Sequence, residues 1–285
     1  MNGFYNVYKP AGISSSHLVV KVRGILRSRT GERPKVGHFG TLDPAAEGVL
    51  PIAVGSATKL FDYSLDKIKV YRADFVWGQT TDTLDADGTL VAEGERVEDP
   101  IRVEAACRTV VGTYGQIPPQ YSAKSVGGVR AYDLARRGVE VVLQPKQVTV
   151  HGIEMLGHEG NCFSFVITCS AGTYIRSICR DIATAMGTVG YMSRLIRLRS
   201  GDFDVTQSVS IEEIEADYRA HFLSLDRYAD ALPHYDLAED VRRRVDNGVP
   251  MQADVDDALF CVRIGGVPYG IGTTKQGLLK IICRL

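Results

Sequence analysis

A single carboxylate stands inside a tightly specified turn early in the chain. Asp43 lies between Leu42 and Pro44, and glycines flank this triplet at Gly40 and Gly48. Because proline disfavours helical backbone at the residue before it, we expect extended geometry at Asp43. Glycine permits sharp turns or the close approach of a ligand. Such a loop could hold one acid at the floor of a cleft, although an Asp-Pro turn between a strand and a helix is a common element without function.

The stretch "GTYIRS", from Gly172 to Ser177, is a second pattern that could do chemistry. A helix that begins after Gly172 would direct its backbone amides and the Arg176 guanidinium toward an anion. A paired arginine also favours the ionised form of a carboxylate. Without its context, Arg176 is equally compatible with a solvated helix face.

The cysteines and histidines are not spaced as metal ligands. The six cysteines contain no C-x-x-C pair and the six histidines no H-x-x-x-H pair, whereas metal ligation needs clustered donors. We therefore expect no metal site, and six reduced thiols of the kind usual in a cytosolic protein. A carboxylate can act as a nucleophile or base at neutral pH without a metal.

Charge is segregated along a chain whose formal net charge is −1. Residues 21–37 contain six Lys or Arg and one Glu, and residues 176–199 contain five Arg and one Asp. Residues 82–104 show the opposite bias, with eight acids and two Arg. Basic segments on a neutral chain can form a local phosphate-binding face, or they can be solvated helix faces.

The elements that must position these residues alternate irregularly between strands and helices. Period-2 patterns predict strands over 3–9, 69–79, 148–156, 162–170 and 192–200. Helical spacing predicts helices over 14–29, 100–111 and 171–187. Residues 80–91 are expected to form a polar turn. This order favours a mixed-sheet α/β or α+β fold over a simple doubly wound sheet.

The composition changes after about residue 226. Residues 227–235, "RYADALPHY", are predicted to be a linker, residues 240–251 a helix and turn, and residues 258–285 short strands. We therefore expect a catalytic domain over 1–226 and a small β-rich domain over 227–285. No secretory signal is visible at the N-terminus, and no apolar stretch approaches the ~18 residues that span a bilayer.

The stretch from Gly37 to Lys59 resembles the active-site motif of the TruB-type tRNA pseudouridine synthases. Further motifs of this family follow in the family's order across roughly residues 3–203. They are "KPAGISS" (Lys9–Ser15), "GSATK" (Gly55–Lys59), "GQTTDTLDADG" (Gly78–Gly88), "PPQYSAKSVGGVRAYDLARRG" (Pro118–Gly138), "CSAGTYIRSICRD" (Cys169–Asp181) and "LIRLRSGDF" (Leu195–Phe203). The C-terminal segment resembles the family's PUA-like RNA-binding domain only weakly.

This resemblance implies a mixed-sheet pseudouridine synthase domain with a thumb element inserted at about residues 118–138. It also implies a cofactor-free isomerisation of uridine 55 in the T-arm of tRNA. The N-glycosidic bond breaks, the uracil rotates, and a carbon–carbon bond forms at carbon 5 of the base. Asp43 aligns with the family's catalytic aspartate. Whether it attacks the base, attacks the ribose or abstracts a ribose proton is left open by the sequence.

The resemblance also assigns substrate-binding roles around Asp43. A uracil stacked in the T-loop must be flipped into a pocket before it can react. His38 aligns with the histidine that occupies the vacated space, Tyr71 with the tyrosine that stacks on the base, and Leu195 with the leucine that packs on it. Arg176 aligns with the arginine that pairs with the aspartate, and Tyr174 lies beside it in the same motif.

Basic residues of the first helix and of the thumb are predicted to contact tRNA phosphates. Such contacts supply affinity and salt dependence rather than sequence choice. The candidates are Arg27, Arg29, Lys124, Arg130, Arg136 and Arg137.

The leading hypothesis is thus a stand-alone, cytoplasmic and monomeric tRNA enzyme without an obligate protein partner or a membrane. One alternative is the guide-RNA-dependent relative that works within a ribonucleoprotein, although basic tails and long extensions are lacking. Another alternative is an RNA-folding factor that binds the T-arm without chemistry. A folding role could also accompany catalysis.

Overall fold

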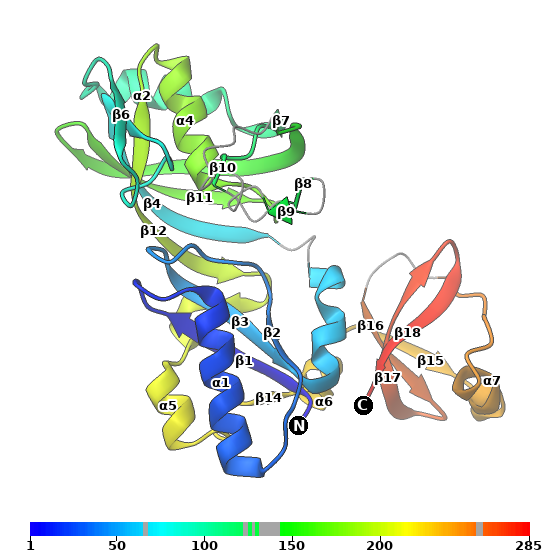
Figure 1. Ribbon diagram of the computed structural model, residues 1–285. Coiled ribbons are helices and arrows are strands. Elements are labelled where there is room, and N and C mark those ends of the chain that lie inside the picture. Colours follow the sequence, from blue (N-terminus) through cyan, green and yellow to red (C-terminus); the bar gives the residue numbers. More distant parts are fainter. Residues whose placement is uncertain (65–67, 122–124, 127–128, 131–142, 255–258) are drawn as a thin grey trace.

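The computed structural model describes residues 1–64, 68–121, 125–126, 129–130, 143–254 and 259–285, which form a mixed α/β protein (Figure 1). Its central sheet has the strand order β14-β1-β3-β12-β4-β11-β10-β7, with β2 paired to β3 and β13 paired to β12. The predicted fold class is therefore confirmed. These strands are β1 (Gly3–Lys9), β2 (Val36–His38), β3 (Glu47–Val54), β4 (Lys69–Trp77), β7 (Gly112–Gln116), β10 (Lys146–Glu159), β11 (Cys162–Cys169), β12 (Gly190–Ser200), β13 (Phe203–Asp204) and β14 (Leu223–Ser224).

The middle of this sheet joins its two halves. Strand β12 pairs antiparallel with β4 on one side and parallel with β3 on the other, where Arg197 stands opposite Gly48. The strands predicted over 3–9, 69–79, 148–156, 162–170 and 192–200 correspond to β1, β4, β10, β11 and β12. Strands β10 and β11 pair with each other, as expected. The β3–β12–β4 seam brings the early and late motifs of the chain together.

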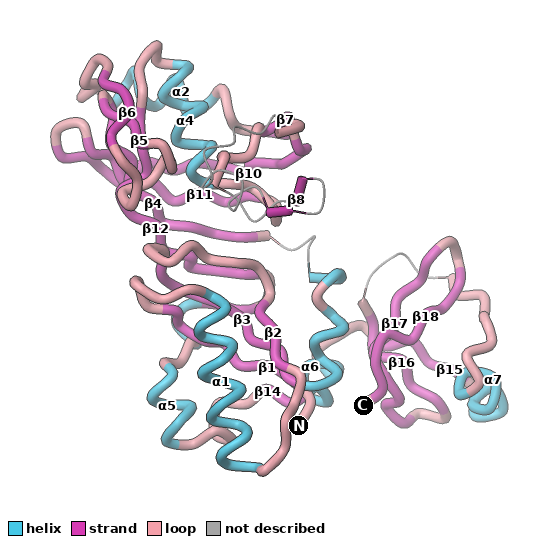
Figure 2. Tube along the Cα trace, in the orientation of Figure 1, coloured by secondary structure: helices cyan, strands magenta, loops and turns pink. Residues whose placement is uncertain are grey.

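The helices cover each half of the sheet separately (Figure 2). Helices α1 and α5 pack on the half that contains β1 and β3, and α2 and α4 pack on the half that contains β10 and β11. The helices are α1 (Ser15–Thr30), α2 (Pro100–Arg108), α4 (Ile175–Ala185), α5 (Ile211–Ala216), α6 (Leu225–Asp230) and α7 (Arg242–Asp246), with short 3₁₀ turns η1 (Gly55–Leu60), η2 (Asp62–Ser64), η3 (Val205–Gln207) and η4 (Glu239–Val241).

Two of the predicted helices show how local sequence sets their ends. Helix α1 begins after the N-cap Ser14 and ends at Gly31, which has a φ of 75°. Helix α4 begins at Ile175, later than predicted. The reason is that Gly172 has a φ of 81° and Tyr174, the N-cap, is extended. Gly172 therefore turns the chain before the helix rather than opening it.

The C-terminal segment forms a second sheet in the order β15-β16-β17-β18. Its strands are β15 (His234–Leu237), β16 (Phe260–Ile264), β17 (Val267–Lys275) and β18 (Leu278–Arg284). The predicted linker over 227–235 is wrong, because residues 227–230 belong to α6 and residues 234–235 to β15, so that only residues 231–233 connect the two. Leu225 and Ala229 of α6 are buried in an apolar cluster with Phe4, Cys261 and Ile271. Since this cluster contains residues from both sheets, the division into domains at residue 226 stays a prediction.

Two small hairpins complete the described chain. Strand β5 (Gln79–Thr81) pairs with β6 (Leu90–Glu93) around the predicted polar turn. Strands β8 (Ser125–Val126) and β9 (Val129–Arg130) are the only part of residues 122–142 that the structure describes. Most of the expected thumb, residues 118–138, therefore lies outside the described residues. No helix in the described part of the chain is long and apolar enough to cross a membrane.

Candidate active site

Asp43 lies in the loop that connects β2 to β3. The loop is bent at both ends by glycines with positive φ, 95° at Gly40 and 101° at Gly48. The Ser15 hydroxyl at the start of α1 holds its centre, because it donates to the Leu42 carbonyl at 2.8 Å and accepts from the Leu42 amide at 2.9 Å. The predicted glycine-flanked turn is thus present, and the first helix fixes it in place.

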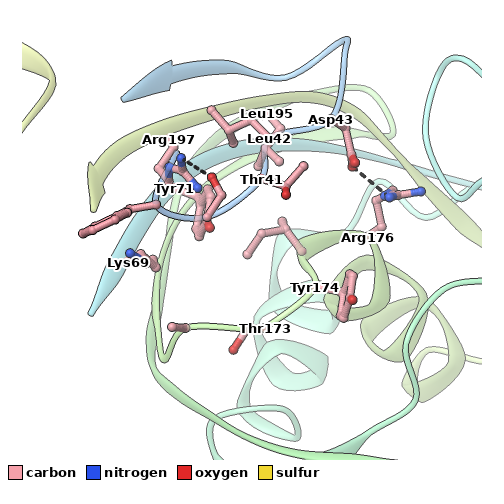
Figure 3. Close-up of a pocket in the computed structure, with 15 residues that line it drawn as sticks. Thr41, Leu42, Asp43, Lys69, Tyr71, Thr173, Tyr174, Arg176, Leu195 and Arg197 are labelled. Atoms are coloured by element: carbon pink, nitrogen blue, oxygen red, sulfur yellow. Dashed lines mark hydrogen bonds and ion pairs between the residues drawn. The ribbon is translucent and has the colours of Figure 1, made fainter. Parts of the chain in front are cut away.

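Arg176 pairs with Asp43 across the seam of the sheet. A guanidinium nitrogen lies 2.8 Å from a carboxylate oxygen of Asp43, and the Arg176 side chain is only 7% exposed (Figure 3). The guanidinium also donates to the carbonyl oxygens of Thr83 at 2.9 Å and Tyr121 at 3.1 Å. Because these bonds come from several directions, the planar guanidinium is held in one orientation.

Asp85 is a third member of this cluster that the sequence did not indicate. Its carboxylate lies 3.3 Å from Arg176 and is 12% exposed. The Thr83 hydroxyl donates to it at 2.6 Å. Its local sequence, in the turn between β5 and β6, was interpreted as a polar turn and as part of the family motif over Gly78–Gly88, with no role for Asp85. The available signals were that motif and the run of acids in the segment. Among the described residues, no group of three or more His, Cys, Asp or Glu side chains is arranged to hold a metal ion.

Lys9 also supports the loop that carries Asp43, and the sequence did not indicate it as a site residue. Its side chain is fully buried, and its ammonium donates to the carbonyl oxygens of Pro44 at 3.0 Å and Ala46 at 2.6 Å. Burial lowers the pKa of Lys9 to about 8, while the nearby carboxylate of Asp43 opposes that shift. This lysine therefore ties the end of β1 to the loop that carries the acid.

The electrostatic environment of Asp43 is mixed. Burial raises the pKa of its carboxyl above the ordinary value, the Arg176 guanidinium opposes this rise, and the neighbouring Asp85 adds to it. The guanidinium thus favours the ionised carboxylate, as predicted, while the net direction of the shift is upward. A carboxylate made more basic in this way is suited to act as a base or nucleophile.

A cavity of about 250 Å³ opens beside Asp43. Tyr71 from β4, Leu195 from β12 and Tyr174 at the start of α4 line it together with Asp43 and Arg176 (Figure 3). The structure therefore brings five of the predicted site residues to one cavity. Tyr71 and Leu195 are 8% and 7% exposed, so they present buried apolar surface next to the carboxylate. Such a cavity can bind a flat, partly apolar ring beside a charged pair.

His38 lies in a neighbouring cleft of about 590 Å³, which shares Asp43 and Arg176 with the first cavity and is also lined by Asp85. Its Nδ1 atom is buried and has no hydrogen-bond partner among the described residues. Burial lowers the pKa of His38, and the charge of Arg197 adds to this. His38 is therefore expected to be neutral, next to the cavity rather than inside it.

Two of the predicted phosphate-binding residues, Arg27 and Arg29, lie in the last turn of α1. At 1.5 Å per residue they are about 18 and 21 Å along the helix from its first residue, Ser15. Arg29 donates to the Glu215 carbonyl at 2.7 Å. Lys124, Arg136 and Arg137 lie outside the described residues, and Arg130 is described only as part of the backbone of β9. Their role stays a prediction.

The upward shift of the Asp43 pKa predicts where activity is lost in acid. If the reacting form is the carboxylate, protonation removes it, so the rate should fall as the pH drops through the raised pKa. The midpoint of this acid limb should therefore lie above 3.8, the ordinary value. The measurement is the single-turnover rate against pH at saturating substrate. A His38→Gln variant is the control, since the limb should keep its position if His38 does not cause it. A midpoint at or below 3.8 in the wild type would refute this assignment.

Comparisons with known proteins match most of this chain to one family. Residues 26–175 match the family model described as TruB family pseudouridylate synthase (N terminal domain). Residues 176–230 match the one described as tRNA pseudouridylate synthase B C-terminal domain. Proteins named tRNA pseudouridine synthase B include one from Syntrophotalea carbinolica, 39% identical over 90% of this chain and 83% of its own. The one from Clostridium kluyveri is 35% identical over 99% of both chains.

Solved structures with the same fold include a chain of a Cbf5-Nop10-Gar1 complex. It has a TM-score of 0.72 and 23% identity, covering 98% of this chain and 83% of that one. A chain of an H/ACA RNP bound to a substrate RNA containing 2′-deoxyuridine has a TM-score of 0.70 and 21% identity, with coverage of 98% and 83%. At this level of identity, the likeness concerns the fold alone.

Proposed function

Because the chain belongs to the TruB family of pseudouridylate synthases, we propose that it isomerises uridine 55 in the T-arm of tRNA to pseudouridine. The observation that carries the proposal is the ion pair of Asp43 and Arg176, 2.8 Å apart, at the edge of a cavity lined by Tyr71 and Leu195. The Arg176 side chain is buried, whereas the Asp43 side chain is 38% exposed and so accessible to a substrate. An isomerase of a nucleoside needs one reactive group beside a site for a flat base, and this arrangement supplies both.

In the proposed reaction Asp43 is the catalytic residue. The bond between C1′ of the ribose and N1 of the uracil breaks, the base rotates, and C1′ bonds to C5. C5 then loses its proton and N1 gains one, so the product is an isomer of the substrate. The carboxylate of Asp43 supplies the nucleophile or base, and Arg176 holds it ionised and oriented. Asp85 faces the other side of the guanidinium and fixes its plane.

The cavity also explains how a flipped base would be retained. Extracting a base from the T-loop costs a few kcal/mol, which contacts in the pocket must offset. Tyr71 offers an aromatic face and Leu195 an apolar surface, and both are almost fully buried. Stacking on an aromatic side chain contributes roughly 1–3 kcal/mol per base. We place His38 in the space that the base leaves, since it lies in the adjoining cleft.

We further propose that the enzyme acts as a cytoplasmic monomer on free tRNA, without an obligate protein partner. The long match to relatives named tRNA pseudouridine synthase B supports this, in contrast to the below-25% identity to chains of ribonucleoprotein complexes. The small C-terminal sheet is proposed as an accessory RNA-binding domain.

The test is to incubate the purified protein with an unmodified tRNA transcript and to map pseudouridine by chemical labelling. We expect one pseudouridine, at position 55, and none in a transcript that has cytidine there. No product without an added guide RNA would favour the ribonucleoprotein relative. Product at another position would reject the proposed substrate site.

Metal removal should leave the activity unchanged. The carboxylates of Asp43 and Asp85 already face the Arg176 guanidinium at 2.8 and 3.3 Å, so a protein cation pairs with both of them. We expect full single-turnover rates in excess EDTA once the tRNA is folded. Activity that is lost in EDTA and restored by zinc, but not by magnesium, would contradict this expectation.

A further inference from the structure

Arg197 is a buried cation beside the cavity whose role the proposed reaction does not explain. It lies on β12 and is 1% exposed, yet it lines the same cavity as Asp43 and Tyr71. No carboxylate lies within 4 Å of its nitrogens among the residues that the structure describes. A buried guanidinium needs its donors satisfied, so its partners indicate what it does.

Those partners lie at the two ends of the loop that carries Asp43. The Nε atom of Arg197 donates to the Val49 carbonyl at 2.7 Å, and an Nη atom donates to the Gly40 carbonyl at 3.0 Å (Figure 3). The guanidinium therefore closes the loop from residue 40 to residue 49 by two charge-assisted hydrogen bonds. Such bonds are shorter and stronger than those between neutral groups.

The backbone of Arg197 is equally close to the loop. Arg197 stands opposite Gly48 in the parallel pairing of β12 with β3. A Cβ atom at Gly48 would lie 2.2 Å from the Arg197 carbonyl oxygen, which is closer than atoms can approach. Glycine at position 48 thus permits both the positive φ of the loop and its contact with β12.

The same side chain reaches the residue proposed to stack on the base. Tyr71 on β4 stands opposite Arg197 in the antiparallel pairing of these strands. Burial raises the pKa of the Tyr71 hydroxyl, and the charge and hydrogen bond of Arg197 oppose this rise. One guanidinium thus contacts the loop of the acid and the aromatic wall of the base site.

We propose that Arg197 is a positioning residue for the pseudouridine synthase reaction, which fixes the Asp43 loop and Tyr71 relative to each other. The inference rests on the proposed function. Its chemistry requires the carboxylate and the base to be held in position relative to each other, because a misplacement of about 1 Å can cost roughly a hundredfold in rate. Arg197 acts through these two groups, because its hydrogen bonds go to the backbone of the Asp43 loop.

The test compares Arg197→Lys with Arg199→Lys, two residues further along β12. Arg199 is exposed and donates to the Gly201 carbonyl at 2.8 Å, so it is a matched control outside the cavity. Lysine keeps the charge but cannot donate to both ends of the loop. We expect Arg197→Lys to lower the single-turnover rate at saturating tRNA by at least about tenfold, with the tRNA Kd within about twofold. Arg199→Lys should change neither the rate nor the Kd.

Rescue separates positioning from general structural support. In Arg197→Ala, millimolar guanidinium ions should enter the vacated space and restore part of the rate, whereas equal sodium chloride should not. A wild-type rate in Arg197→Lys, or a change confined to the Kd, would overturn the inference. So would a folded Arg197→Ala protein that guanidinium does not stimulate. If Arg197→Ala does not fold, the Arg197→Lys comparison decides the question. If the wild type itself makes no pseudouridine, the proposed function has failed instead.

Discussion

Asp43→Asn is expected to abolish pseudouridine formation while tRNA binding stays near the wild-type level. The amide is nearly isosteric with the carboxylate but is neither a nucleophile nor a base. The loop should survive the change, because Ser15 holds it through the Leu42 backbone and Lys9 holds it through the carbonyl of Ala46. The measurements are a single-turnover rate at saturating tRNA and a binding titration.

A thermal unfolding curve of the Asp43→Asn protein is the control for a lost fold. If the variant keeps about a tenth of the wild-type rate or more, which is a barrier difference of only about 1.4 kcal/mol, Asp43 does not have the central role. If the variant replaces the wild type in every cellular assay, tRNA folding rather than isomerisation is the function that matters there.

Arg176→Lys should have the second-largest effect, although it keeps the charge. The guanidinium bridges Asp43 at 2.8 Å and Asp85 at 3.3 Å and also donates to two backbone carbonyls. An ammonium cannot make this planar set of contacts. Breaking a buried ion pair costs ~3–5 kcal/mol, against ~0–1 kcal/mol for an exposed pair. The Arg176 side chain is 7% exposed and that of Asp85 12%, while that of Asp43 is 38% exposed, so the buried case applies to the guanidinium and its contact with Asp85. Each ~1.4 kcal/mol added to the activation barrier lowers the rate about tenfold, so the loss of a buried ion pair predicts a rate at least about a hundredfold lower.

The matched control is Arg180→Lys on the same helix. Arg180 is 30% exposed and pairs with the adjacent Asp181 at 2.7 Å, so its replacement should change the single-turnover rate by less than about twofold. A result in which Arg176→Lys alters only the affinity for tRNA would place the active site away from "GTYIRS".

The sequence predicted the parts of the site that depend on local constraints. Proline and two glycines specify the turn of Asp43, and the start of a helix makes Arg176 a candidate partner for an anion, while the resemblance to the family's motifs assigned both their roles. The missed residues depend on contacts between distant segments. Asp85 reaches Arg176 only because the β5–β6 turn folds over α4, and Arg197 reaches Gly40 only through the pairing of β12 with β3. Neither contact can be predicted from the residues that flank Asp85 or Arg197 in the sequence.

For the fold, too, the elements set by local sequence were predicted and those set by distant contacts were not. Strands β1, β4, β10, β11 and β12 were predictable because their apolar residues alternate. The segment 227–235 was interpreted as a linker because the composition changes there. Its first residues instead continue α6, in which Leu225 and Ala229 bury their side chains against Phe4 and Cys261, and its last two residues begin β15. In this segment, the burial of apolar side chains against the rest of the protein determines the structure more than the local sequence does.

The most direct measurement is a crystal structure of the Asp43→Asn protein with a T-arm stem-loop that contains uridine at position 55. This variant should bind the substrate without converting it. We predict that the uracil of this uridine lies in the cavity between Tyr71 and Leu195, with its ribose next to residue 43 and Arg176. A bound stem-loop whose uridine stays stacked in the loop, or enters another part of the surface, would contradict the account.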